Sequence, residues 1–342
     1  MSTADLSLAT RELFDRSMVN EVYYKLPFVE ELQRRRQITY SGGTNIEKLV
    51  DTDEIDDLMQ EYTANSVLTD EKKTTLDKPK FYWKLAQLPL RYDVDEELQN
   101  ISAGNEIQLL DLADHLVTKG QRATKLWLQS KLFNGGTTTA LTDTGTQVQS
   151  LVSALDHDTT YGTLTRSFSA GTRDWWQGSD PGALLENVSS SAQDTATNFT
   201  KSNLRKWINE TNVAHNMEGT DDIMVLVCPT LFNKLAAEME SSIIYKPGLK
   251  QSQGIVSMNF DGHEIVSVPF MQTNSTMRGW VFILNLRYWE LRIHEKRNFK
   301  MTDFEWQGKM ANGHDYWLAR ILFSGNFVCW KPNSSMWLSS VS

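Results

Sequence analysis

The sequence predicts an α+β fold, and three observations lead to this prediction. Residues 104–133 have the apolar period of one long helix. The stretch DIMVLVCP reads as a buried strand followed at once by a helical segment, which is typical of an α/β layer. Residues 279–330 contain strand-like apolar runs, and one of these runs is long enough to leave a first core and enter a second.

The N-terminal region is predicted to be an arm. Residues 5–24 can form an amphipathic helix in which Leu6 and Leu13 are apolar among charged residues, and we expect Pro27 to interrupt it. A strand follows at QRRRQITYSGG and is closed by two glycines.

A long excursion comes next. About thirty acidic and polar residues, EKLVDTDEIDDLMQEYTANSVLTDEKKTTLDK, contain too few apolar positions for a core of their own. The chain then returns through KPKFYWKLAQLPLRYD, residues 78–93, which we expect to be one long extended segment. Residues 36–92 are therefore predicted to be a hairpin-like excursion with a span far beyond an ordinary hairpin loop.

The returning segment raises the question of what it packs against. Its apolar residues switch parity between Leu85 and Leu88, and the proline that follows has no backbone donor, a pattern that favours an exposed, bulged edge strand. The aromatic cluster Phe81, Tyr82 and Trp83 would be costly to leave in water. It lies either on another molecule or on the chain's own body, and both interpretations are open at this point.

The helix over residues 104–133 is the clearest element. It would run about 45 Å at 1.5 Å per residue, longer than a small domain is wide, so we interpret it as a spine across a flat or elongated molecule. Residues 134–202 are rich in loop-forming residues. After them we expect a short helix at KSNLRKWINETN and a second one at TLFNKLAAEMES, capped by Thr230.

Composition limits the function classes. The net charge is −9, from 43 acidic and 34 basic residues, so the whole-chain field repels polyanions such as DNA. The N-terminus has acidic residues where a secretory signal is basic, and nothing approaches the roughly 18 apolar residues of a spanning helix. Cys228 and Cys329 lie in apolar strand-like runs, which favours reduced, buried thiols in a cytosolic compartment.

No motif predicts an enzyme. The histidines form no His-x-x-x-His pair, and the sequence has neither a phosphate-binding glycine loop nor a nucleophile elbow. We interpret DHD at 156–158 as a solvated loop and the acidic run 51–57 as a solvated face. We therefore predict no catalytic, cofactor-binding or metal-binding residues.

Two small basic clusters, RRR at 34–36 and EKR at 295–297, are too small for strong binding to nucleic acid. They suit an acidic protein surface better. The acidic run 51–57 of another copy of the chain is a candidate partner.

The order of these parts resembles the major capsid proteins of tailed bacteriophages with the Hong Kong 97-type fold. Local sequence agrees, because YSGGTNI, the Trp-Lys pair at 83–84, RYDVDEELQN, the long helix ending in NGG, and YGTLTRS…WW follow one another as in a common phage version of these proteins. Thr163 departs from the Tyr-Gly-Gly-Ile-x-Arg that is usual there. The resemblance covers nearly the whole chain.

The resemblance implies a domain plan. Its parts would be an N-terminal arm (1–35), an extended E-loop (36–98), a spine helix of the peripheral domain (99–136), an axial domain (137–278), returning peripheral strands (279–330) and a C-terminal segment (331–342).

The resemblance also implies a function. The chain would assemble into pentamers and hexamers of an icosahedral head enclosing double-stranded DNA, without catalysis, cofactor or membrane. A portal would be a partner, and since the chain starts at the arm, we expect a separate scaffolding protein. It would be found in the virion, and in the host cytoplasm during assembly.

Contacts between subunits would then be made by the returning strand, lying on a neighbour, and by the charged clusters. The expected contact residues are Phe81, Tyr82, Trp83, Lys84, Arg34, Arg35, Arg36, Asp53 and Glu54. Two alternatives are open, namely a related non-viral compartment shell that encloses cargo, and a soluble enzyme with an unrecognised site in the polar region 134–202.

Overall fold

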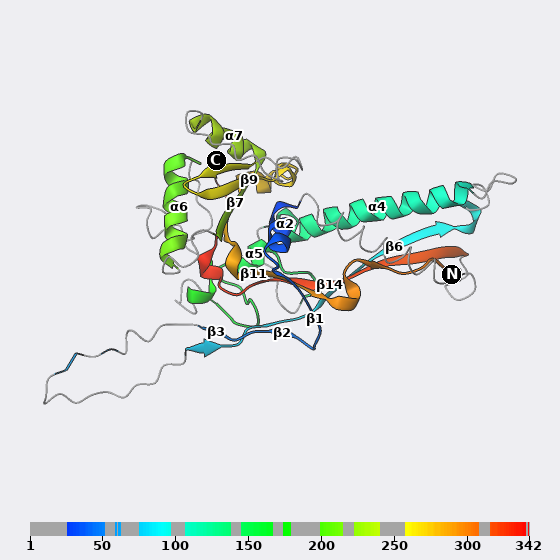
Figure 1. The fold of residues 1–342 in the computed structure, drawn as a ribbon, viewed down its shortest axis with the longest axis horizontal. Helices are drawn as coiled ribbons and strands as arrows, with labels where there is room; N and C mark the ends of the chain where they lie inside the picture. Colours follow the sequence, from blue (N-terminus) through cyan, green and yellow to red (C-terminus); the bar gives the residue numbers. More distant parts are fainter. Residues whose placement is uncertain are drawn as a thin grey trace.

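The computed structural model describes residues 26–51, 59, 61–62, 75–96, 107–137, 145–166, 174–178, 199–214, 222–239, 257–307, 315–339 and 341. They form an elongated molecule in which two sheets meet near the middle (Figure 1). A two-stranded ribbon leaves the body at one end, and a long helix with the two long strands of the six-stranded sheet extends toward the other.

The six-stranded sheet is organised around β14 (Tyr316–Cys329), which is long enough to pair with four other strands. The C-terminal part of β14 pairs with β11 (Trp289–His294), and β1 (Ile38–Ser41) pairs with the other edge of β11 in parallel. The N-terminal part of β14 pairs along one edge with the whole of β6 (Lys84–Asp93). Two short strands, β12 (Lys300–Met301) and β13 (Glu305–Trp306), pair with the other edge of this N-terminal part.

The five-stranded sheet has the order β15-β10-β7-β9-β8. Its central strand β7 (Ile223–Val227) is buried at every position, as expected for a strand covered on both faces. The other strands are β15 (Met336–Leu338), β10 (Val281–Asn285), β9 (His263–Ser267) and β8 (Ser257–Phe260). Helices α6 (Lys201–Ala214) and α7 (Pro229–Glu238) lie beside this sheet (Figure 1).

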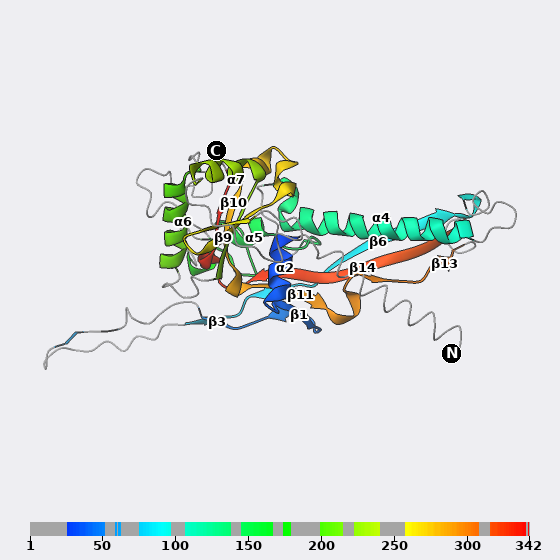
Figure 2. The same ribbon diagram turned by 45° about the horizontal axis from the view of Figure 1, so that its top comes forward.

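The long helix α4 (Ile107–Leu132) confirms the predicted spine. It lies along β6 and β14 (Figure 2). A Cβ atom at Gly120 would stand 3.0 Å from Leu90 and 3.1 Å from Ile321, so the glycine lets the helix approach the sheet closely. Val117, Leu128 and Leu132 are buried on the same side.

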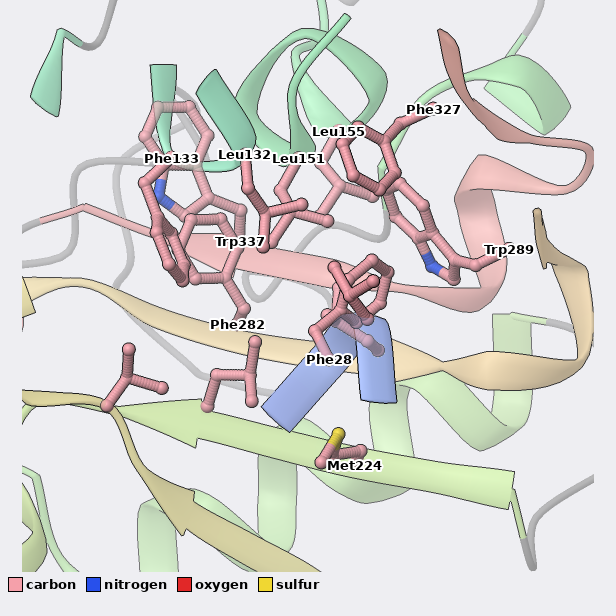
Figure 3. Close-up of a cluster of buried hydrophobic side chains, with 14 of the residues drawn as sticks. Phe28, Leu132, Phe133, Leu151, Leu155, Met224, Phe282, Trp289, Phe327 and Trp337 are labelled. Carbon is pink, nitrogen blue, oxygen red and sulfur yellow. The ribbon is translucent and has the colours of Figure 1, made fainter. Parts of the chain in front are cut away.

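The core lies where the two sheets meet (Figure 3). Phe28 from α2 (Pro27–Arg34) packs edge-on against Trp289, with ring centroids 5.6 Å apart. Leu151 and Leu155 from α5 (Leu151–Leu155) are fully or almost fully buried in the same cluster. Residues from both sheets therefore share one apolar core, which joins them into one body.

Short 3-10 turns connect these elements. They are η2 (Asn134–Gly136), η3 (Asp174–Trp176), η5 (Pro269–Gln272), η6 (Thr276–Gly279), η7 (Leu286–Tyr288), η8 (Glu295–Arg297) and η9 (Pro332–Ser334).

The excursion is a two-stranded ribbon. Its first pair is β2 (Ile46–Glu47) with β5 (Lys80–Phe81), and its second is β3 (Val50–Asp51) with β4 (Leu76–Asp77). We call residues 46–81 the ribbon and the β2/β5 pair its base.

Several local predictions need correction. The segment 78–93 is not one strand, because β5 belongs to the ribbon and β6 to the six-stranded sheet. No bulge interrupts β6, which pairs residue by residue with β14 from Lys84 to Asp93. Pro27 occupies the first turn of α2, where a missing N–H costs nothing, and the helix that it was expected to interrupt lies outside the described residues.

The cap of α7 was also predicted wrongly. The helix begins at Pro229, so the residue before it, Cys228, is the N-cap and its Sγ accepts from the N–H of Leu231 at 3.5 Å. The predicted amphipathic helix 5–24 lies outside the described residues.

Candidate assembly surface

The ribbon beyond its base exposes large apolar side chains. Leu49 is 64% and Leu76 56% exposed, and towards the tip Met59 is 90% and Tyr62 67% exposed. The strands β3 and β4 pair only with each other in the described chain. Apolar groups of this size on a projecting element are typical of a surface that another molecule covers.

The ribbon also concentrates negative charge. From Leu49 to Asp70 the sequence has seven acidic residues and no basic one. Asp53 and Glu54, two predicted contact residues, lie in this stretch but outside the described residues.

The aromatic cluster divides between the inside and the outside of the molecule. Phe81 is 1% exposed and packs against Tyr161 and Trp330, so it belongs to the chain's own core and is not free to contact a neighbour in this conformation. Trp83 is half-buried, and its indole N–H donates to the carbonyl of Gly43 at 2.9 Å. Tyr82 is 42% exposed and is the member of the cluster that a second molecule could reach.

Lys84 is likewise an interior residue. Its side chain is 4% exposed, and its Nζ donates to the carbonyl of Gly145. It starts the buried face of β6, where Leu90 and Tyr92 are also buried, while Leu85 on the opposite face is 64% exposed.

Two of the three clustered arginines serve the fold. Glu31, 2% exposed, accepts from Arg34 Nε at 2.9 Å and from Arg35 Nε at 3.0 Å. Arg35 also donates to Asp222, next to β7, and so ties α2 to the five-stranded sheet. Arg36, exposed and with a φ of 58°, is the one of the three for which the described residues show no ion pair.

These contacts set the charge of both guanidinium groups. The hydrogen bond to Glu31 raises the pKa of Arg34. Burial opposes the charge of Arg35, but its hydrogen bonds to Asp222 and Glu31 outweigh burial and raise its pKa too. Both arginines therefore stay cationic and form ion pairs within their own chain, with Glu31 and, for Arg35, also with Asp222.

The outer face of α4 offers a different basic surface, which lies outside the two basic clusters at 34–36 and 295–297. Between His115 and Thr137 the sequence has four basic residues and no acidic one. Lys119, Arg122 and Leu126 follow one another at helical spacing on the exposed side, and Leu126 is 52% exposed. The signal that could have found this face was the one-sided charge of the helix.

The YGTLTRS motif forms a tight turn. Tyr161 and Leu164 bond each other through both N–H groups at 3.1 Å, and Gly162 and Thr163 between them have φ values of 59° and 64°. Two successive residues with positive φ are the mark of a type I′ turn.

Arg166 holds this turn against its surroundings. It is 1% exposed, and its guanidinium donates to the carbonyls of Ala154 at 2.8 Å, Trp176 at 3.0 Å and Thr159 at 3.0 Å. The motif is thus a structural element, because its buried arginine donates to three backbone carbonyls around the turn.

A reaction centre in the interior would be marked by a hollow lined with chemically active side chains. A hollow of about 90 Å³ opens between α4 and the sheet, and the side chains that line it carry no titratable group. In the described part of the chain, no three His, Cys, Asp or Glu residues gather as metal ligands would. Both cysteines are free and buried. No helix in the described ranges is long and apolar enough to cross a membrane.

Comparison with known proteins finds similarity in structure alone. No protein-family model and no curated protein matches the chain. The capsid of cyanophage A-1(L) matches with a TM-score of 0.57 at 12% identity, over 90% of each chain.

Two further capsids agree. That of cyanophage Pam1 matches with a TM-score of 0.51 at 10% identity, over 88% of this chain and 86% of the other. The capsid of a native GTA particle matches with a TM-score of 0.50 at 10% identity, over 91% and 90%. Because these matches span nearly all of each chain, the protein has the Hong Kong 97-type fold of tailed-phage capsid proteins.

Proposed function

We propose that this protein is a major capsid protein, whose function is to assemble with copies of itself into the icosahedral head of a tailed phage. The observation that carries the proposal is the ribbon, whose leucines at 49 and 76 are more than half exposed and are not enclosed by the described part of the chain. Burying one such side chain at an interface is worth roughly 1.5–3 kcal/mol. Contacts of this kind, repeated by symmetry, make a closed shell far more stable than one interface alone.

The charges indicate where the ribbon docks. Arg34 and Arg35 are occupied within their own chain, so the outer face of α4 is the better partner for the acidic stretch 49–70. The ribbon and α4 extend toward opposite ends of the molecule (Figure 1), so a ribbon reaches α4 of a second copy more readily than its own. Charge complementarity of this kind sets the approach and register of subunits.

The remaining parts of the proposal rest on the resemblance to phage capsid proteins. Subunits would form pentamers and hexamers, a portal and a separate scaffolding protein would take part in assembly, and the shell would enclose double-stranded DNA. A net charge of −9 suits a wall that holds DNA without binding it tightly. Assembly would take place in the host cytoplasm and the product would be the virion.

The first experiment is light scattering and negative-stain electron microscopy on the purified protein over a range of concentrations and salts, with and without extract from phage-infected cells. Closed particles, or pentamers and hexamers that grow with concentration, would support the proposal. A strict monomer under all these conditions would overturn it.

A shortened ribbon tests which part of the chain assembles. Residues 52–75 can be replaced by Asn-Gly, because Asp51 pairs with Leu76 and a two-residue turn closes such a pair. We expect this variant to keep its circular dichroism and thermal unfolding but to form no shells. Two double variants test whether the ribbon acts through its apolar side chains. Leu49→Asp with Leu76→Asp should block assembly, whereas Leu49→Met with Leu76→Met should not.

The docking face is tested by charge reversal. Lys119→Glu with Arg122→Glu should block assembly, and Lys296→Glu with Arg297→Glu, equally exposed on η8, serves as the control. If the η8 pair alone blocks assembly, the ribbon docks there and the assignment to α4 is wrong.

A further inference from the structure

The base of the ribbon is built into the body, unlike the part beyond it. Phe81 is opposite Ile46 in the β2/β5 pair, and these two side chains are 1% and 4% exposed. Leu49, three residues after Ile46, and Leu76, five residues before Phe81, are both exposed to solvent. The change from interior to exterior therefore takes place within a few residues on each strand.

Phe81 contacts aromatic rings from two distant parts of the chain. Its ring centroid lies 4.9 Å from that of Tyr161, at an interplanar angle of 66°, and 5.7 Å from that of Trp330, at 83°. Edge-to-face pairs of this geometry restrict the orientation of a ring more than aliphatic contacts do. One side chain of the ribbon is thus held by the turn at 161–164 and by the end of β14.

The type I′ turn also touches the ribbon through its backbone. The N–H of Lys80 donates to the carbonyl of Gly162 at 2.9 Å. A Cβ atom on Gly162 would lie 2.8 Å from Phe81 Cζ and 2.9 Å from Pro79 Cβ, so only glycine leaves room for this contact. The turn and the returning strand are therefore fitted to each other.

Tyr161 is itself fixed. Its side chain is fully buried, its hydroxyl accepts from the N–H of Cys329 at 2.8 Å, and its carbonyl accepts from the indole N–H of Trp176 at 2.8 Å. The ring of Tyr161, against which Phe81 packs, is therefore anchored to β14 and η3 and not to the ribbon.

The other strand of the base, β2, is also attached to the body through the residues that flank it. The carbonyl of Gly43 accepts from the indole of Trp83, and the Lys48 ammonium lies 5.5 Å from the ring centroid of Trp330. Beyond these contacts, β3 and β4 form a separate two-stranded sheet. We therefore expect any bending of the ribbon to occur beyond the base.

We infer that Phe81 is a positioning residue that sets the direction in which the ribbon leaves the body before any second subunit is present. The free subunit then presents its ribbon in one preferred direction, with motion confined to the part beyond the base. A fixed ribbon direction would lower the entropy lost when subunits dock, and this benefit rests on the proposed function. The ribbon direction can be measured in the single chain whether or not the chain assembles.

The test measures distances in the unassembled subunit. Spin labels are placed on cysteines at Leu76 of the ribbon and Leu126 of α4, both exposed, and their separation is measured by double electron–electron resonance. The native thiols are buried and should not take the label. We expect one main distance in the parent protein and a distribution about twofold broader in Phe81→Ala, because the base then lacks its ring contacts.

Two further variants keep the test decisive. Phe81→Leu retains an apolar side chain and serves if Phe81→Ala fails to fold, with broadening again expected. Phe260→Ala removes a ring of the same size and burial from β8, and it should lower stability while leaving the distribution unchanged.

A parent distribution as broad as that of Phe81→Ala would overturn the inference, as would equal broadening in Phe260→Ala. Failure of the proposed function is distinguishable from this result. A narrow parent distribution in a protein that never forms shells would leave the positioning role intact and refute the capsid proposal.

Discussion

Replacing Thr163 by glycine should stabilise the protein. Thr163 occupies the second central position of the type I′ turn with a φ of 64°, a region in which a β-branched residue is strained. Its side chain is exposed, so little burial is lost when it is removed. Glycine adopts this backbone conformation without steric cost.

The magnitude follows from three terms. Relief of the left-handed conformation is worth roughly 1–3 kcal/mol. Against it stand the larger unfolded-state entropy of glycine, about 0.5–1 kcal/mol, and the lost hydrogen bond from Thr163 Oγ1 to the carbonyl of Gly162 at 2.6 Å, worth about 0.5 kcal/mol because the group is exposed. The expected net gain is about 1 kcal/mol. With an unfolding entropy of about 2.1 cal/mol/K per residue over 342 residues, this corresponds to a rise in Tm of about 1.4 °C.

The assay is urea unfolding of the unassembled subunit, with thermal unfolding as a second measurement. Thr165→Gly is the matched control, because Thr165 is an exposed threonine of the same segment without a positive φ, and glycine there should destabilise by about 0.5–1 kcal/mol. Opposite signs for the two substitutions are the expected result. If both destabilise by similar amounts, the turn stores no strain at Thr163 and the reasoning is refuted.

Three other substitutions test the interior. Arg166→Lys should cost about 3 kcal/mol in urea unfolding, because one ammonium cannot reach all the carbonyls that the guanidinium satisfies, and a loss below 1 kcal/mol would contradict this. Burial raises the pKa of Cys329 to about 12, so the thiol of the unfolded chain ionises first and the free energy of unfolding should fall as the pH rises above about 9. Cys329→Ala should make the free energy of unfolding less dependent on pH in this range. An unchanged pH dependence would assign the effect to other groups. Gly120→Val should destabilise by about 1–3 kcal/mol as the added methyl groups press on Leu90 and Ile321, and a neutral result would show that α4 can move outward freely.

The long helix was predictable because its evidence is local. Apolar residues repeat along one face from start to end, glycines follow its last turn, and the predicted bounds of 104–133 agree closely with Ile107–Leu132. The passage of the chain from one core to the other was predictable for a similar reason. Its continuous apolar run contains β10 and β11, which lie in different sheets and are separated only by η7.

The position of Phe81 was not predictable from its neighbours in sequence. Nothing near residue 81 distinguishes a ring that packs on its own chain from one that packs on another, since its partners Tyr161 and Trp330 are far along the chain. The roles of Arg34 and Arg35 were hidden in the same way. Asp222 is nearly two hundred residues away, and a run of three arginines looks like a surface cluster until that carboxylate is brought beside it.

The change of parity between residues 81 and 88 nevertheless carried information, although it does not mark a bulge. Phe81 and Lys84 both point into the body, and side chains three residues apart lie on opposite faces of a straight strand. The chain must therefore turn at Tyr82 and Trp83. Two hydrogen bonds hold it there, from Trp83 to the carbonyl of Gly43 and from Asn326 Nδ2 to the carbonyl of Tyr82 at 3.3 Å. A slipped alternation within an apparently continuous strand is thus the local sign that the chain passes from the ribbon to the six-stranded sheet.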